Sequence, residues 1–180
     1  MVGTDAVVSV MEQEGVITAR LDQEKIEGLI PHKKAALLIR RAIVTMSRMG
    51  QPCVIAEAFF NHDGLKSLHE GHFPDEPVLM GVLPQEAIQQ ALALLATYQA
   101  RASGKSRGSK RSAILLGVTD VSWELKALPT DSITVEAYLD SSKRASVEGS
   151  GLARSDQGVI CSVGGIHGMW RLRKRDEIGG

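Results

Sequence analysis

The segment from Val82 to about Ala100 has helical periodicity and is apolar around most of its circumference. An apolar surface this wide is typical of a buried helix rather than of one on a protein surface. The apolar positions are Leu83, Ala87, Ala91, Leu94, Leu95 and Tyr98 on one side, with Val82, Ile88, Leu92 and Ala96 beside them. The polar residues Gln85, Glu86, Gln89 and Gln90 cluster near the start of the segment. We therefore expect a fold that encloses one long helix and leaves its first turns facing something polar.

The residues after this helix have the pattern of an antiparallel sheet. Apolar and polar residues alternate in two stretches, around residues 133–140 and 159–164, and Ala113 to Trp123 predicts a further strand. Two shorter strands are expected before the helix, at residues 37–46 and 52–60. One buried helix with strands before and after it indicates an α+β fold, in which an antiparallel sheet wraps around the helix.

The rest of the chain predicts few regular elements. Residues 21–30 indicate a short helix, with Asp22 as N-cap and Pro31 as the stop. After Phe60 we expect a long loop, because glycine and proline interrupt the segment as far as Pro77. At 180 residues the chain suits one domain. We assign residues 21–180 to that domain and residues 1–20 to an N-terminal extension.

Charge and composition exclude several classes of partner. Lysine and arginine number 21, and aspartate and glutamate also number 21, so no net charge attracts nucleic acid or an anionic membrane. No apolar run approaches the roughly 20 residues of a membrane-spanning helix. The N-terminus lacks the pattern of a secretory signal, which predicts a cytoplasmic protein. Cys53 and Cys161 lie in apolar stretches without neighbouring metal ligands, which favours reduced core thiols over a disulfide.

One constellation carries recognisable chemistry. The loop contains His72-Phe73-Pro74-Asp75-Glu76-Pro77, the helix opens with Gly81-Val82-Leu83, and Glu86 and Gln90 follow. Glu86 comes fourteen positions after His72. This pattern resembles the FabZ-type 3-hydroxyacyl-acyl carrier protein dehydratases, which have a histidine followed by Phe-Pro-x-x-Pro, a Pro-Gly-Val-Leu helix start and a glutamate at the same spacing.

The resemblance extends more weakly to Pro31-His32-Lys33 and to Gly117-Val118-Thr119-Asp120. It implies the hot-dog fold and a lyase that converts a carrier-bound 3-hydroxyacyl thioester to the trans-2-enoyl form. It also implies an acyl carrier protein as partner, a homodimer or higher homo-oligomer, and neither a metal nor an organic cofactor. Glu86 places this chain nearer to the FabZ branch than to the related FabA-type enzymes, which usually carry aspartate at that position.

Dehydration explains why these residue types occur together. A proton must leave C2 of the substrate, and another must reach the departing hydroxyl. Histidine titrates near neutrality, and a carboxyl group on an apolar helix is favoured in its neutral form by desolvation. The resemblance implies that His72 is the base and Glu86 the acid.

The remaining predicted site residues bind or orient. The resemblance implies that the amide of Gly81, at the helix start, binds the thioester carbonyl. Gln90 lies four residues after Glu86 and can orient its carboxyl group. Phe73 and Pro74 are expected to shape the loop beside the histidine. In the family's dimers the histidine of one subunit lies beside the glutamate of the other.

Other polar groups have simpler structural explanations. His69 and His72 have a spacing that permits metal binding, but no third ligand is evident, so we predict no metal site. We interpret His32, His62 and His167 as structural. Two basic clusters, one between Arg101 and Arg111 and one between Arg171 and Arg175, are explained by a solvated surface; docking of an acidic carrier is the alternative.

Departures from the family leave the pathway open. Met80 replaces the usual proline before Gly81, Lys34-Ala35-Ala36 replaces an aromatic and proline cluster, and Arg40 stands where aspartate is common. None of them touches the acid/base pair, so fatty-acid synthesis and polyketide or secondary-metabolite synthesis are both compatible. Two rivals remain: a hot-dog thioesterase, which would release free acid, and a non-catalytic subunit that binds an acyl carrier.

Overall fold

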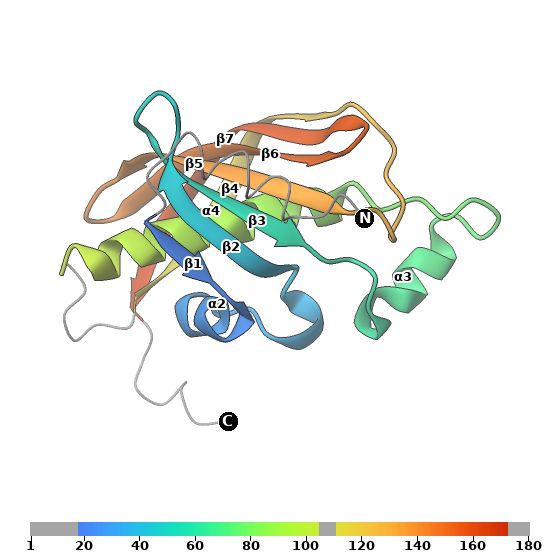
Figure 1. Cartoon of the computed structure of the whole chain (residues 1–180), viewed down its shortest axis with the longest axis horizontal. Coiled ribbons are helices and arrows are strands. Elements are labelled where there is room, and N and C mark those ends of the chain that lie inside the picture. The colour runs from blue at the N-terminus through green and yellow to red at the C-terminus, as the bar shows by residue number, and fades with distance from the viewer. Residues whose placement is uncertain (1–17, 105–110, 173–180) are drawn as a thin grey trace.

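A computed structural model describes residues 18–104 and 111–172 of the chain. Seven antiparallel strands form one sheet in the order β1-β2-β3-β5-β6-β7-β4 (Figure 1). The strands are β1 Ala19–Leu21, β2 Ile39–Met46, β3 Pro52–Ala58, β4 Arg111–Trp123, β5 Ile133–Ser142, β6 Ser146–Ser155 and β7 Gly158–Leu172. The predicted α+β layout with an antiparallel sheet is confirmed.

The sheet curves around the long helix α4, Val82–Ala102 (Figure 1). Residues around most of the circumference of α4 are buried, as its wide apolar surface predicts. Gly149 and Gly151 of β6 allow this close approach. A Cβ atom at Gly149 would lie 2.6 Å from Leu92 Cδ1, and one at Gly151 would lie 2.5 Å from Ile88 Cγ2. The helix therefore packs directly against the backbone of β6.

The first short helix, α2 at Gln23–Leu29, forms where the sequence predicts it. Its N-cap is Asp22, whose Oδ1 accepts a hydrogen bond of 3.0 Å from the amide of Lys25. Ile26 and Leu29 are buried in the core. Residues 1–17, which make up most of the predicted N-terminal extension, lie outside the described residues.

The prediction of an irregular loop throughout the segment after Phe60 is wrong in part. Asp63–Leu65 is a 3₁₀ turn and Lys66–Gly71 is a short helix, α3. Leu65 and His69 are buried, while Lys66 and Glu70 face each other one turn apart on the helix surface. Two buried anchors are enough to order a six-residue helix that a sequence rich in glycine and proline does not suggest. The chain from His72 to Met80 is irregular, as expected.

Cys53 and Cys161 are both buried and free, in agreement with the prediction of reduced core thiols. Burial raises the pKa of each thiol to about 11.

Of the helices in the described ranges, none has the length and apolarity needed to span a membrane.

Candidate active site

Gln90, only 1% exposed, joins α4 to the segment that leads into β2. Its Oε1 accepts a hydrogen bond of 2.9 Å from the amide of Leu38, and its Nε2 donates one of 2.8 Å to the carbonyl of Ala36. A backbone amide can only donate and a carbonyl can only accept, so the orientation of the side-chain amide is fixed.

Glu86 lies one turn before Gln90 on α4. Its Oε1 accepts a hydrogen bond of 3.1 Å from Gln90 Nε2, the contact expected from their spacing. The side chain of Glu86 is 40% exposed. A single chain therefore leaves this carboxyl group more exposed than the predicted desolvation requires.

His32 is the site residue that the sequence interpretation missed. Its Nε2 lies 3.5 Å from Oε1 of Glu86, and its side chain is 30% exposed. The available signal in the sequence is the weak match of Pro31-His32-Lys33 to the family. Nothing in the local sequence places residue 32 beside residue 86, because the contact depends on the path of the chain past Gln90.

His72 follows α3 and is half-buried. Its Nδ1 lies 3.1 Å from the carbonyl oxygen of Val78, and its own carbonyl accepts a bond of 3.0 Å from the amide of Val78. Because a carbonyl only accepts, Nδ1 must carry a proton. In a neutral ring Nε2 is then unprotonated, which is the state that a general base requires.

Phe73 and Pro74 lie in a tight turn beside this histidine. The amide of Phe73 donates to the carbonyl of Glu76, and the amide of Glu76 donates back to Phe73, both at 3.2 Å. The Phe73 ring stacks on His72 with centroids 4.3 Å apart. Both Phe73 and Pro74 are exposed, and Lys126 Nζ holds the turn through Glu76 at 2.8 Å. These residues therefore restrict the position of the His72 ring.

Gly81 is the N-cap of α4. Its carbonyl accepts a hydrogen bond of 3.1 Å from Trp123 Nε1, and a Cβ at this position would lie 2.6 Å from the same nitrogen. A larger residue would displace the indole from the start of the helix. In the described part of the chain the amide of Gly81 donates no hydrogen bond, so it is available to an external acceptor.

One chain does not bring the predicted acid and base together. Among the contacts between described residues, those of His72 do not include Glu86, and those of Glu86 do not include His72. Figure 1 shows α3 and the loop that follows it projecting away from the sheet. Glu86, Gln90 and His32 form one group, and His72 with its turn forms another.

The FabA-like domain family model matches residues 30–164, most of the chain, and includes every site residue described above. The chain belongs to this family.

Relatives of the FabA-like chain confirm the FabZ-type resemblance. The 3-hydroxyacyl-[acyl-carrier-protein] dehydratase FabZ of Francisella tularensis subsp. novicida is 29% identical over 164 residues. The alignment covers 85% of this chain and 94% of that protein. The FabZ of Francisella tularensis subsp. holarctica strain LVS matches to the same extent.

Solved structures confirm the hot-dog fold. The dehydratase heterocomplex ApeI:P from Xenorhabdus doucetiae has a TM-score of 0.61 at 16% identity, covering 85% of this chain and 93% of that one. The dehydratase domain of a mycocerosic acid synthase-like polyketide synthase has a TM-score of 0.62 at 18% identity, covering 93% of this chain and 53% of that one. Thioesterase HI1161 from Haemophilus influenzae scores 0.53 at 12% identity, with coverages of 87% and 94%.

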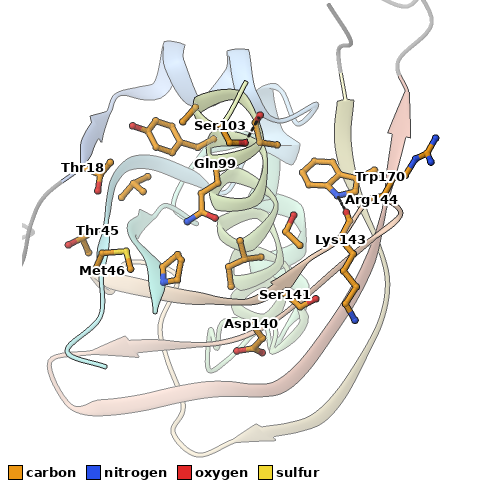
Figure 2. A pocket seen from close by; sticks show the side chains of 17 residues that line it. Thr18, Thr45, Met46, Gln99, Ser103, Asp140, Ser141, Lys143, Arg144 and Trp170 are labelled. Atoms are coloured by element: carbon orange, nitrogen blue, oxygen red, sulfur yellow. Dashed lines mark hydrogen bonds between the residues drawn. The ribbon is translucent and has the colours of Figure 1, made fainter. Parts of the chain in front are cut away.

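Two cavities of the FabA-like chain have linings that include neither the predicted base nor the predicted acid. A cleft of about 880 Å³ opens at the C-terminal end of α4, lined by Gln99, Ser103, Lys143 and Trp170 among others (Figure 2). A smaller cavity of about 510 Å³ lies beside α3 and includes His62 and His69. Neither cavity has His72 or Glu86 in its lining.

Metal ligands are not assembled in the described ranges, where no cluster of three His, Cys, Asp or Glu side chains has an arrangement that could hold an ion. His69 uses its Nε2 to donate to the carbonyl of Phe60 at 2.8 Å, so this nitrogen already has a partner. The spacing of His69 and His72 therefore reflects a structural anchor followed by a loop residue.

Proposed function

We propose that this protein is a dehydratase that converts a 3-hydroxyacyl-acyl carrier protein thioester to the trans-2-enoyl thioester, with His72 as base and Glu86 as acid. The observation that carries the proposal is that, in a FabA-like domain, hydrogen bonds orient the side chains of both residues for these roles. Nδ1 of His72 faces the carbonyl of Val78, which leaves Nε2 as the free nitrogen of the neutral ring, and Glu86 is oriented by the buried Gln90.

The proposed step is an elimination in which two protons move. The C2–H bond breaks and its proton goes to Nε2 of His72, while the electron pair forms the C2=C3 double bond. The C3–O bond breaks, and the departing oxygen takes the proton of Glu86 and leaves as water. Negative charge that develops on the thioester oxygen would be stabilised by the amide of Gly81 at the start of α4.

The catalytically active form is proposed to be a homodimer in which the β4 strands of two chains pair. This 13-residue strand is an edge of the sheet and is bonded to β7 alone among the described strands. Leu116 and Trp123 on it are 66% and 55% exposed, and long edges with apolar side chains are prone to pairing. A second chain would supply the missing half of a site in which His72 and Glu86 do not meet within one chain.

The carrier is proposed to dock at the basic end of the β4–β7 pair. Arg111 opposes Leu172 in the sheet, so the end of the first basic cluster lies beside the start of the second. Residues 105–110 and 173–175 of these clusters lie outside the described residues. An acidic carrier would be attracted there by charge complementarity.

Charge reversal tests the docking surface. Arg101→Glu with Arg171→Glu should raise KM for the carrier-bound substrate several-fold and leave turnover of a small-molecule thioester unchanged. Lys25→Glu, on α2, is the matched control. Carrier kinetics unaffected by the double reversal would remove this surface from the proposal.

The pathway is proposed to be fatty-acid or polyketide synthesis in the cytoplasm. Both FabZ and a polyketide synthase dehydratase domain are among the proteins that this chain resembles. The substitutions at Met80 and in Lys34-Ala35-Ala36 lie close to the site residues in sequence and would affect which acyl groups fit.

The decisive assay is incubation with a panel of 3-hydroxyacyl carriers, followed by mass measurement of the product. Loss of one water identifies the dehydratase. Release of free acid would favour the thioesterase alternative, with which the fold is also compatible. Binding without any mass change would indicate a non-catalytic subunit.

Two conservative variants test the residue roles. His72→Asn retains a donor toward Val78 but has no base, and Glu86→Gln retains an acceptor for Gln90 but has no proton to give. Each should lower kcat by about 10²-fold or more, with the circular dichroism spectrum unchanged. Near-normal turnover in either variant would refute its assigned role.

A further inference from the structure

The segment from Pro31 to Leu38 is tied to α4 through the buried side chain of Gln90. Gln90 accepts from the amide of Leu38 at 2.9 Å and donates to the carbonyl of Ala36 at 2.8 Å. These two hydrogen bonds fix the path of the chain shortly after His32. The approach of His32 to Glu86 therefore depends on a buried anchor and not only on two half-exposed side chains.

Both neighbours of the Glu86 carboxyl group approach the same oxygen. Gln90 Nε2 lies 3.1 Å from Oε1, and His32 Nε2 lies 3.5 Å from it. No hydrogen bond to Oε2 comes from any residue in the described ranges. Oε1 accepts the N–H of Gln90 and has His32 Nε2 beside it, and an accepting oxygen is not the one that presents an acidic proton, so the two oxygens of this carboxyl group are not equivalent.

We propose that His32 is a positioning residue for the acid. Together with Gln90 it holds Oε1 as an acceptor, which leaves Oε2 to carry the proton that is given to the departing hydroxyl. This inference rests on the proposed dehydration, in which Glu86 is the acid.

The role of His32 follows from the charge that the reaction creates. When the O–H bond at Oε2 breaks and the proton joins the departing oxygen, Glu86 becomes a carboxylate. A proton on Nε2 of His32, which lies 3.5 Å from Oε1, would stabilise that negative charge without touching the substrate. His32 neither gains nor loses a proton in the elimination itself.

Two substitutions separate this role from a purely structural one. His32→Ala removes the donor, whereas His32→Gln places an amide N–H within similar reach of Oε1. We expect kcat of His32→Ala to fall by about 10-fold or more with KM changed by less than about 3-fold, and His32→Gln to recover most of the loss. His167→Ala, at an exposed histidine of β7, is the matched control and should behave as wild type.

Two kinetic outcomes would overturn the proposal. One is a His32→Ala enzyme with kcat within about 2-fold of wild type. The other is a His32→Gln enzyme that folds normally, judged by its melting temperature, but is as slow as His32→Ala. The first would show that the donor is dispensable, and the second that restoring it has no effect.

A measurement without turnover tests the contact directly. The ring ¹⁵N signals of His32 should change when Glu86 is replaced by Gln, and those of His167 should not. Unchanged His32 signals would overturn the inference whether or not the protein is active. If wild type releases no water from any 3-hydroxyacyl carrier, the proposed function is rejected, and the proton-delivery role of His32 is rejected with it.

Discussion

Gln90 joins three parts of the site through one side-chain amide. It satisfies the buried amide of Leu38 and the carbonyl of Ala36, and it donates to Glu86. Gln90→Ala would leave two backbone groups without partners, and we expect the free energy of unfolding to fall by about 2–4 kcal/mol. Because Glu86 also loses a donor, kcat should fall as well. Urea denaturation and steady-state kinetics measure the two effects.

Gln89→Ala is the matched control for this prediction, because Gln89 is the adjacent residue of α4 and only partly buried. It should change the free energy of unfolding by no more than about 0.5 kcal/mol. Equal stability of the two variants would contradict the anchoring role of Gln90.

The two buried thiols predict a pH dependence of stability. Burial raises the pKa of Cys53 and of Cys161 from the ordinary value of 9.0 to about 11. Above pH 9 the unfolded chain loses thiol protons that the folded chain keeps, so the free energy of unfolding falls as the pH rises from 9 to 11. Below pH 9 this contribution is fully present. Each thiol accounts for up to about 1.4 kcal/mol per pH unit.

Urea denaturation at pH 8 and pH 10 measures this fall, and the Cys53→Ala, Cys161→Ala double variant is the comparison. The variant should lose less stability between the two pH values than wild type does. Equal losses in both proteins would show that the thiols do not titrate differently on folding.

At the scale of secondary structure, the contact between α4 and β6 depends on glycine. A Cβ at Gly151 would lie 2.5 Å from the carbonyl oxygen of Glu136 and 2.5 Å from Ile88 Cγ2. The backbone of Glu136 can move away only at a large energetic cost, so Gly151→Ala should lower the free energy of unfolding by about 1–3 kcal/mol. Chemical denaturation is the measurement.

Gly28→Ala on α2 is the control with the opposite expected sign. Nothing lies within 4 Å of a Cβ at Gly28, and alanine is the better helix former. We expect a gain of up to about 1 kcal/mol in the free energy of unfolding. A loss at Gly28 as large as that at Gly151 would mean that close packing against α4 is not the cause.

At the scale of the whole molecule, β4 is the edge strand through which we propose that two chains pair. Leu116 lies where the β4–β7 register shifts, between Leu115 and Gly117, and it is exposed. Leu116→Asp should turn the proposed dimer into monomers and abolish turnover, because His72 and Glu86 do not meet in one chain. Sedimentation velocity and the dehydration assay are the measurements.

Met49→Asp is the control for this experiment, since Met49 is an equally apolar, exposed residue in the turn between β2 and β3. It should remain dimeric and active. A Leu116→Asp protein that is still a dimer and still active would exclude β4 as the interface.

Several elements could be predicted because their signals are local. The apolar circumference of α4, the alternation in β5 and β7, and the N-cap of α2 depend on residues within a few positions of one another. The helix α3 could not be predicted, because it depends on the burial of Leu65 and His69 in the folded chain and not on a local helical pattern. Pairing of β3 with β5 is also a contact between distant segments, with α4 and β4 between them in sequence.

The sequence by itself determined that a buried helix would be enclosed by antiparallel strands, and which residues could supply an acid and a base. These conclusions depend on the order of side chains along the chain. Only the tertiary structure decided that His32 lies beside Glu86, that Oε1 has both neighbours, and that His72 remains apart in a single chain. The physical reason is that these contacts depend on how a buried side-chain amide and a curved sheet place distant segments in space.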